Sequence, residues 1–385
     1  MEASRIRINA KGLLMRPTTS LVRIRAVAFV PYPFGTAPSQ RFRLEQWAPH
    51  LAARGISVEF RPFATADFVK QLYRSGHAFG KVVGLARTMA AQLRRMPARG
   101  EFDVAVVHRS MSLIGPAFLE RRLARLTPLV YDFDDAIHLL HTSDANRAFG
   151  WLKFPAKTGE ICALARSVTV GNEYLARFAR GYNRSVDIVP SSVDTAAYTP
   201  GPTRVRAGLP VVGWMGSSTS QTYLEPFGLL LSRLVKEGFR FRIVSDRRPS
   251  SFDFPFEWTA WSAGTEVSDL RQFDIGIMPL PDTEWAKGKC AMKLLQYMGV
   301  GVPSIGSALG GNLEVIRDGE NGYLAGSDDD WLEKALRLAR DPELSRRLGD
   351  AGRETVLARY SAEVCASRFA AVLERTAAGH GKHAR

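Results

Sequence analysis

The sequence predicts an α/β protein of two Rossmann-like domains that face each other across a cleft. Three observations indicate this fold class. The chain has 385 residues, too many for one ordinary core and suited to two α/β domains of similar size. Short apolar runs alternate with helical segments in both halves, as in doubly wound parallel sheets. A stretch rich in proline and glycine, 199–210, has the composition of a linker between the halves.

The first half predicts one βα domain, 21–198, after a lead-in, 1–20, that we expect to be disordered. It opens with a strand at Val22–Val30, a Pro/Gly turn and a helix from Ser39. An amphipathic helix is expected over 79–96. Further short apolar runs predict buried parallel strands at Ser57–Phe60, Asp103–Val107, Pro128–Tyr131, Val168–Val170 and Val186–Val189.

The pattern restarts after the linker and predicts a second domain over 211–360. A helix is expected at Leu224–Glu237, and a last one from an N-cap at Ser361 to about Thr376. We expect this last segment, 361–385, to pack back on the first domain. The strands of the second domain are expected at Val211–Trp214, Phe241–Ser245, Asp274–Met278 and Pro303–Ile305. Two such halves place a ligand cleft between them.

The charge balance points to an anionic partner. The formal net charge is +14, which suits phosphorylated substrates, an acidic membrane surface or nucleic acid. The surplus is concentrated in 70–125, where eleven lysines and arginines face three acidic residues. An ordinary solvated surface accounts for these charges equally well. Three widely spaced cysteines indicate neither a disulfide framework nor a zinc site. No apolar run is long enough for a transmembrane helix or a secretory leader, so we expect a cytoplasmic protein.

The most informative segment is 288–306, GKCAMKLLQYMGVGVPSIG. As a helix over 289–298 it has a core stripe and, opposite, a polar face with Lys289, Lys293 and Gln296. Gly288 stands at the expected helix N-terminus, where backbone N–H groups and the helix dipole favour a phosphate. The alternative is an exposed helix with two ordinary surface lysines.

This segment and its neighbours resemble the donor-binding region of family 4 glycosyltransferases, which have the GT-B fold. Four stretches carry the resemblance: Gln296–Pro303, Gly310–Ile316, Asp318–Leu324 and Val189–Asp194. The resemblance covers most of 22–375. It implies transfer of a sugar from a nucleotide diphosphate sugar with retained configuration, and it implies neither a covalent nucleophile nor a metal or other cofactor. Within the matching segments, Asn312 and Glu314 are carried over as donor-side candidates.

The sequence departs from the family pattern at four positions. Gly288 and Gln296 stand where the family has glutamates that contact the donor sugar and the ribose. The loop that usually carries an arginine and a lysine for the diphosphate is Gly216–Ser220, and it has neither. We hypothesise that Lys289 and Lys293 replace that pair. Gly216, Ser217 and Ser218 can still offer N–H and hydroxyl groups to phosphate.

An acidic strand end supplies the catalytic candidates. Asp132-Phe133-Asp134-Asp135 follows a buried strand, where α/β enzymes keep their chemistry. Asp134 or Asp135 is expected to bind sugar hydroxyls or to take the acceptor's proton, or else to cap a helix. The Asp-x-Asp pattern also resembles metal-dependent enzymes of the GT-A fold. On the acceptor side we expect Gly35, Arg41 and His138, with a surface role equally open for Arg41.

The sequence therefore predicts a glycosyltransferase whose partners are a nucleotide sugar and a glycan or lipid-linked acceptor in cell-envelope or polysaccharide synthesis. The basic face of the first half adds a possible peripheral contact with an anionic membrane surface. Three alternatives remain open: a sugar-nucleotide epimerase or phosphorylase, a non-catalytic sugar-nucleotide or glycan-binding relative, and a nucleic-acid-binding protein. The last is disfavoured because no aromatic-basic recognition motif is present.

Overall fold

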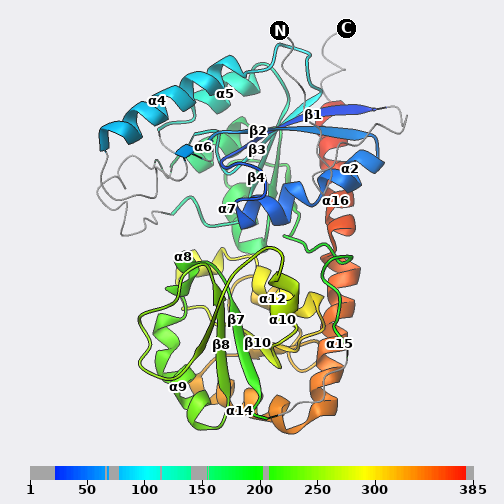
Figure 1. Cartoon of the computed structure of the whole chain (residues 1–385). Helices are drawn as coiled ribbons and strands as arrows, with labels where there is room; N and C mark the ends of the chain where they lie inside the picture. The colour runs from blue at the N-terminus through cyan, green and yellow to red at the C-terminus, as the bar shows by residue number, and fades with distance from the viewer. Residues whose placement is uncertain are drawn as a thin grey trace.

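The computed structural model contains two parallel six-stranded sheets, each within its own domain (Figure 1). It describes residues 22–378 except 66, 69–77, 113–114, 140–153, 155 and 203–207. The expected lead-in 1–20, the middle of the linker and the end of the tail lie outside the described residues. The predicted fold class, two Rossmann-like domains, is confirmed.

The first sheet has the order β2-β1-β3-β4-β5-β6. Its central strands β3 and β4 are short, mostly apolar and wholly buried because helices cover both faces. One face packs against the helices α5, α6 and α7, and the other packs against α2 and α16. The strands are β1 (Ile24–Val30), β2 (Ile56–Pro62), β3 (Val104–His108), β4 (Leu129–Phe133), β5 (Ser167–Val170) and β6 (Val186–Ile188). The helices are α1 (Pro38–Gln40), the π-helix η1 (Arg41–Glu45), α2 (Ala48–Ala53), α4 (Ala78–Arg94), α5 (Phe118–Ala124), α6 (Ala156–Leu164) and α7 (Glu173–Arg180).

The second sheet has the order β12-β11-β10-β7-β8-β9. Helices α9 and α14 pack on one face, while α10, α12 and α15 pack on the other. The strands are β7 (Val211–Met215), β8 (Arg240–Ser245), β9 (Glu257–Ala260), β10 (Ile275–Met278), β11 (Ser304–Ser307) and β12 (Tyr323–Ala325). The helices are α8 (Ser218–Gln221), η3 (Glu225–Phe227), α9 (Gly228–Lys236), α10 (Glu266–Leu270), α11 (Glu284–Lys287), α12 (Met292–Gly299), α13 (Asn312–Val315), α14 (Asp328–Arg340), α15 (Pro342–Arg359) and α16 (Ala362–Ala378).

The two last helices tie the domains together. In Figure 1 α15 runs along the second domain and α16 continues alongside the first. Buried side chains of α16, among them Phe369 and Leu373, join the core cluster that contains β1 and β3. Within the part of the chain that the structure describes, no helix has the length and apolar character to cross a membrane.

Candidate active site

The carboxyl ends of the strands in both sheets meet at one interface. Arg41, in the helix that follows β1, forms two hydrogen bonds of 2.8 and 2.9 Å with Glu266, at the start of α10. Lys289, beyond β10, lies 2.8 Å from a carboxylate oxygen of Asp135, which follows β4. In each sheet the strand order reverses at this level, between β1 and β3 and between β7 and β10. Such switch points are where α/β sheets bind ligands.

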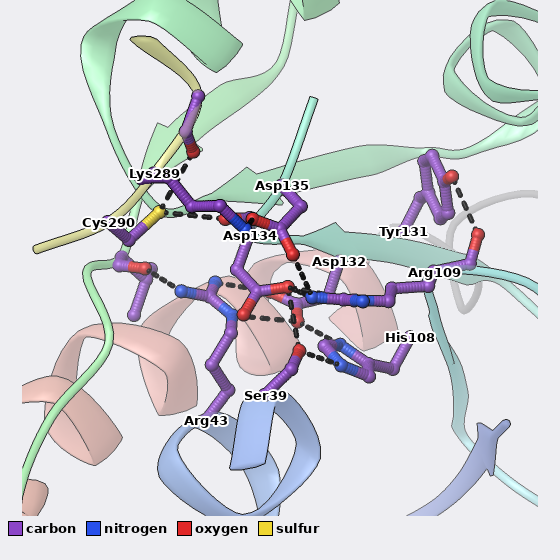
Figure 2. A network of polar contacts seen from close by, with 12 residues as sticks. Ser39, Arg43, His108, Arg109, Tyr131, Asp132, Asp134, Asp135, Lys289 and Cys290 are labelled. Carbon is purple, nitrogen blue, oxygen red and sulfur yellow. Dashed lines mark hydrogen bonds and ion pairs between the residues drawn. The ribbon is translucent and has the colours of Figure 1, made fainter. Parts of the chain in front are cut away.

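Asp132 anchors the N-terminal side of this interface (Figure 2). Its carboxylate is completely buried and accepts hydrogen bonds from Arg43 at 2.5 and 3.0 Å and from Thr169 at 2.6 Å. His108 Nδ1 lies 2.7 Å from Oδ2, the oxygen that also accepts from Arg43 Nε. Burial alone would raise the pKa of Asp132, but Arg43 and His108 hold it well below its usual range. This carboxylate is therefore ionised and structural, and it is not free to bind a metal as part of an Asp-x-Asp pair.

Asp134 and Asp135, the predicted catalytic residues, share one cation, Arg109. Its Nε and Nη2 lie 2.9 and 2.7 Å from Asp134 Oδ1, and Nη2 is 2.6 Å from Asp135 Oδ2. Despite burial, Arg109 and His108 hold the pKa of Asp134 well below its usual range. Both carboxylates lie at the interface between the domains, where Asp135 meets Lys289. Their catalytic role stays a prediction.

Arg109 itself has a strained backbone. Its φ is +59°, a left-handed conformation that non-glycine residues rarely adopt. Two hydrogen bonds fix it: its N–H donates to Asp132 O at 2.7 Å, and the Tyr131 hydroxyl donates to Arg109 O at 2.7 Å. Such strain persists where the surroundings over-determine the conformation. Here it directs the guanidinium across the two carboxylates (Figure 2).

The expected helix over 289–298 begins later than predicted. Gly288 closes α11, Ala291 has a left-handed φ of 53°, and α12 starts at Met292. The expectation of Gly288 at a helix N-terminus, with Lys289 and Lys293 on one helical face, is therefore wrong. The reason is tertiary: Lys289 O accepts a hydrogen bond from Gly311 N, and Cys290 Sγ contacts Asp134 O at 3.0 Å. These contacts hold the segment in a non-helical path.

Gly288 is also at a point of close approach between the domains. A Cβ added there would lie 2.7 Å from Ala136 Cβ and 2.8 Å from Ala136 N. A glutamate, as at the corresponding family position, has no room in this arrangement. The absence of a side chain at 288 lets the two domains touch.

The two lysines differ in their surroundings. Lys289 is paired with Asp135, which raises the pKa of the ammonium although burial opposes this. Lys293 lies over the Trp214 ring, 5.1 Å from its centroid. Among the described residues, no carboxylate forms an ion pair with Lys293. Burial and then the neighbouring charge of Lys289 lower its pKa to about 8. Lys293 is thus a cation beside Lys289 that has no ion-pair partner among the described residues.

Gln296 is buried on α12 and meets a carboxylate that the sequence did not single out. Its amide donates to Glu266 Oε1 at 2.6 Å and to the Tyr198 hydroxyl at 3.2 Å. Glu266 in turn binds Arg41. A carboxylate therefore lies beside the position where the family has its second glutamate, supplied by another element.

The other donor-side candidates have defined partners. Gly216 packs under the Trp214 ring, where an added Cβ would lie 2.5 Å from the nearest ring carbon. Ser218 Oγ donates to Asp246 at 2.8 Å, and Ser217 Oγ lies 2.9 Å from Thr219 Oγ1. Asn312 is fully buried and its amide donates to Ser307 O at 3.0 Å, so it supports the end of β11.

Glu314 and the acceptor-side candidates lie around the same interface. Glu314 accepts a hydrogen bond of 2.9 Å from Glu173 N across the domains, and burial raises its pKa. Gly35 has a φ of +77° and its N–H donates to Glu45. His138 stacks on Phe178 with 3.8 Å between ring centroids, and burial lowers its pKa. Arg41 is occupied by Glu266, so it serves the domain interface in this structure.

Sequence reasoning missed three residues at the centre of the site: Ser39, His108 and Arg109. Ser39 Oγ lies 2.8 Å from His108 Nε2 and 2.7 Å from Asp134 Oδ1. His108 and Arg109 stand at the end of β3, so the strand-end rule that selected Asp134 would have selected them too. Glu266 carries no comparable sequence signal.

Comparison with known proteins identifies the class. Residues 210–341 match the family model Glycosyl transferases group 1. Over 85 residues, 22% of this chain and 22% of the relative, the chain is 36% identical to N-acetyl-alpha-D-glucosaminyl L-malate synthase of Bacillus anthracis. Over 68 residues, 17% of this chain and 18% of the relative, it is 40% identical to the putative glycosyltransferase EpsD of Bacillus subtilis. The match thus spans only about a fifth of either curated relative.

Solved structures share the whole architecture. Sucrose-phosphate synthase of Thermosynechococcus elongatus superposes with a TM-score of 0.64 at 14% identity, covering 92% of this chain and 99% of that one. HepE of Anabaena, solved with UDP-glucose, gives a TM-score of 0.62 at 14% identity, covering 91% of this chain and 100% of that one. The chain has the GT-B fold. Its second domain carries the match to the group 1 glycosyltransferases, which covers residues 210–341.

Proposed function

We propose that this protein transfers a glycosyl group from a nucleotide diphosphate sugar to a glycan or lipid-linked acceptor, with retention of configuration and without a metal ion. We place this reaction in cell-envelope or polysaccharide synthesis. The observation that carries the proposal is Lys293, a half-buried cation at the strand-end cleft of a group 1 domain.

A diphosphate suits Lys293 because it supplies the missing negative charge. Burial disfavours the ammonium, and no ion pair within the described residues compensates it. A phosphate oxygen next to Lys293 forms a charge-assisted hydrogen bond in a water-poor site, where such bonds are strongest. The same contact stabilises the leaving diphosphate as the glycosidic bond breaks. Lys289, balanced by Asp135, contributes less net charge.

Substituting the two lysines separately tests the donor site. We expect Lys293→Ala to weaken binding of the nucleoside diphosphate by roughly 10- to 100-fold, the range of one hydrogen bond to a charged group. We expect a smaller loss for Lys289→Ala. Lys236→Ala, on the exposed end of α9, is the control and should leave affinity unchanged. Calorimetry with UDP, GDP and ADP measures all three. Equal affinity in Lys293→Ala and the control contradicts the proposal.

The reaction itself is tested by product analysis. HepE was solved with UDP-glucose, so UDP-glucose heads a panel with GDP- and ADP-linked hexoses. Release of nucleoside diphosphate with transfer of the sugar supports glycosyl transfer. An isomerised sugar nucleotide indicates an epimerase, and binding without turnover indicates a non-catalytic relative. Activity that disappears with a chelator and returns with a divalent ion contradicts metal independence.

A membrane-bound acceptor is the second part of the proposal. Helices α4 and α5 each carry exposed arginines and one exposed apolar side chain, Leu93 at 38% and Phe118 at 55% exposure. Such a surface favours an anionic bilayer. We expect the protein to sediment with vesicles of phosphatidylcholine and phosphatidylglycerol and to be released from them at high salt. Pure phosphatidylcholine vesicles are the control, and failure to bind the anionic vesicles contradicts this part.

A further inference from the structure

We propose that Asp134, Ser39, His108 and Asp132 form a proton relay that carries the acceptor's hydroxyl proton away from the reacting sugar. The relay rests on the proposed glycosyl transfer. It extends that function to Ser39 and His108, which act through Asp134.

The four groups form a continuous chain built from three elements. Ser39 lies on α1, His108 at the end of β3, and the two carboxylates at the end of β4. Ser39 Oγ is 2.7 Å from Asp134 Oδ1 and 2.8 Å from His108 Nε2. His108 Nδ1 is 2.7 Å from Asp132 Oδ2. The imidazole is only 1% exposed, so water does not replace any of these links. Figure 2 shows the serine between the imidazole and Asp134.

The chemistry of each group fixes the direction of the chain. Asp132 is ionised and can only accept, so the proton between it and His108 belongs to Nδ1. His108 Nε2 is therefore the end that can take up a proton. The Ser39 hydroxyl has one proton and can direct it either to Asp134 or to Nε2. Rotation of this hydroxyl connects the carboxylate with the imidazole.

Asp134 has one oxygen for the acceptor and one for the relay. Arg109 and Ser39 both donate to Oδ1, and none of the hydrogen bonds between described residues reaches Oδ2. Oδ2 can thus meet an acceptor hydroxyl. Arg109 makes Asp134 a weak base that does not retain a proton. The ionised Asp132 lies 2.7 Å from Nδ1 of His108 and stabilises a positive charge on the imidazole, so His108 is the better final site.

The step balances in atoms and charge. The acceptor oxygen forms a bond with the anomeric carbon while the bond from that carbon to the diphosphate oxygen breaks, and the electron pair leaves with the diphosphate. The acceptor's proton passes to Asp134 Oδ2, and rotation of the carboxyl group brings this proton to Ser39 Oγ. Asp134 protonates Ser39 Oγ as Ser39 gives its own proton to His108 Nε2. Asp132 stabilises the resulting imidazolium. The proton returns to solvent after the products leave.

The charged neighbours of His108 belong to the elements packed around it. Arg43 lies on the other side of Asp132, and Arg109 binds Asp134. Glu45, on η1, interacts electrostatically with His108 from the same helical segment as Arg43. Both signs of charge therefore surround the imidazole.

Ser39, His108 and Asp132 also have the connectivity of a Ser-His-Asp triad. Ser39 is unsuited to be a nucleophile here, because Asp134 lies 2.7 Å from its oxygen. A tetrahedral oxyanion formed on Ser39 would face this carboxylate instead of hydrogen-bond donors. Proton transfer is the role that fits both neighbours of Ser39.

Ser39→Ala and Ser39→Thr form the matched test. The assay follows nucleoside diphosphate release from UDP-glucose, or from another sugar nucleotide of the panel that is turned over, with water as the acceptor. Ser39→Ala should lower kcat at least about tenfold, a modest share of acid–base catalysis, because the connection between Asp134 and His108 is lost. Ser39→Thr keeps a hydroxyl and should restore kcat.

Two further measurements keep the outcomes separate. Affinity for UDP, GDP or ADP should be the same in both variants, since a structural role of Ser39 would disturb it. A proton inventory of wild-type single turnovers in mixed light and heavy water should be curved, because several protons move. A linear inventory, or Ser39→Ala with wild-type kcat, overturns the relay. A wild type that neither binds nor turns over any sugar nucleotide overturns the proposed function instead.

Discussion

Charged side chains at the cleft are distributed unequally between the two domains. The N-terminal domain contributes three carboxylates and pairs them with its own arginines, and the C-terminal domain places Lys289 and Lys293 nearest to them. One lysine, Lys289, completes the pairing with Asp135, and Lys293 does not. The residues are Arg43, Arg109, Asp132, Asp134, Asp135, Lys289 and Lys293. This leaves one positive charge on the donor side, where a diphosphate is expected.

The lowered pKa of Lys293 makes diphosphate affinity depend on pH. Its folded pKa is about 8, below the ordinary lysine value, so the free protein loses this charge as pH rises through about 8. Affinity for the nucleoside diphosphate should therefore fall across that range. Lys293→Arg keeps its charge at all these pH values and should show a flat profile. Calorimetry at several pH values measures both, and parallel profiles contradict this role of Lys293.

The buried Arg43–Asp132 pair should matter for stability more than any surface pair. Both side chains are 0% exposed. Removing one partner leaves a buried charge uncompensated, which typically costs about 3–5 kcal/mol. We expect Arg43→Ala to lower the free energy of unfolding of the N-terminal domain by about 3 kcal/mol in urea denaturation. Arg240→Ala, whose pair with Glu257 is well exposed, is the control and should cost under about 1 kcal/mol. An equal loss of unfolding free energy in Arg43→Ala and Arg240→Ala would contradict a stabilising role of the buried Arg43–Asp132 pair.

Among the secondary elements, the central strands were predictable and two edge strands were not. Runs such as Asp103–Val107 predict β3 because a strand buried on both faces is a short apolar run. β9 (Glu257–Ala260) is half-exposed, with Glu257 paired to two arginines. β12 (Tyr323–Ala325) has only three residues. Neither segment has an alternation of apolar and polar residues that distinguishes it from a loop. An edge strand of this kind forms because it pairs with the neighbouring strand of the sheet.

The candidate site was predictable where a local rule applied. Asp134 and Asp135 followed from a buried strand and its end, whereas the expected helix over 289–298 was wrong because contacts from Gly311 and Asp134 hold Lys289 and Cys290 out of the helix. Glu266 approaches Gln296 from 30 residues away. Contacts of this kind depend on how distant segments pack, so the local sequence pattern does not predict them.

Gly288 should tolerate no side chain. An added Cβ meets the backbone and side chain of Ala136 within 2.8 Å, so Gly288→Ala must push α11 and the loop after β4 apart. We expect a lower melting temperature and weaker binding of UDP, GDP or ADP, because Lys289 is displaced from Asp135. Gly326→Ala is the control, since nothing lies within 4 Å of a Cβ there. Gly288→Ala with control-like stability and affinity contradicts the close approach.

On the scale of the whole molecule, the chain crosses between the domains twice. The linker leads from the first domain into β7, and α15 leads back into α16 (Figure 1). Arg353 on α15 donates to Tyr198 O and Gly299 O, so it holds the linker end against the second domain. Each domain therefore depends on a segment distant in sequence. The two crossings and the pairs Arg41–Glu266 and Lys289–Asp135 fix how the two halves of the site meet.

The last helix should therefore control the stability of the first domain rather than the second. Phe369 on α16 is 1% exposed and lies 5.1 Å from the Trp47 ring centroid, within the N-terminal core. Phe369→Ala leaves a cavity there and should cost about 3–5 kcal/mol. Amide hydrogen exchange followed by mass spectrometry should show faster exchange in β1, β3 and α2, with β7 and β10 unchanged. Leu229→Ala, at a side chain that is 81% exposed, is the control and should alter neither domain. Loss of protection in the second sheet alone would contradict this placement, because α16 contributes its buried side chains to the core of the first domain.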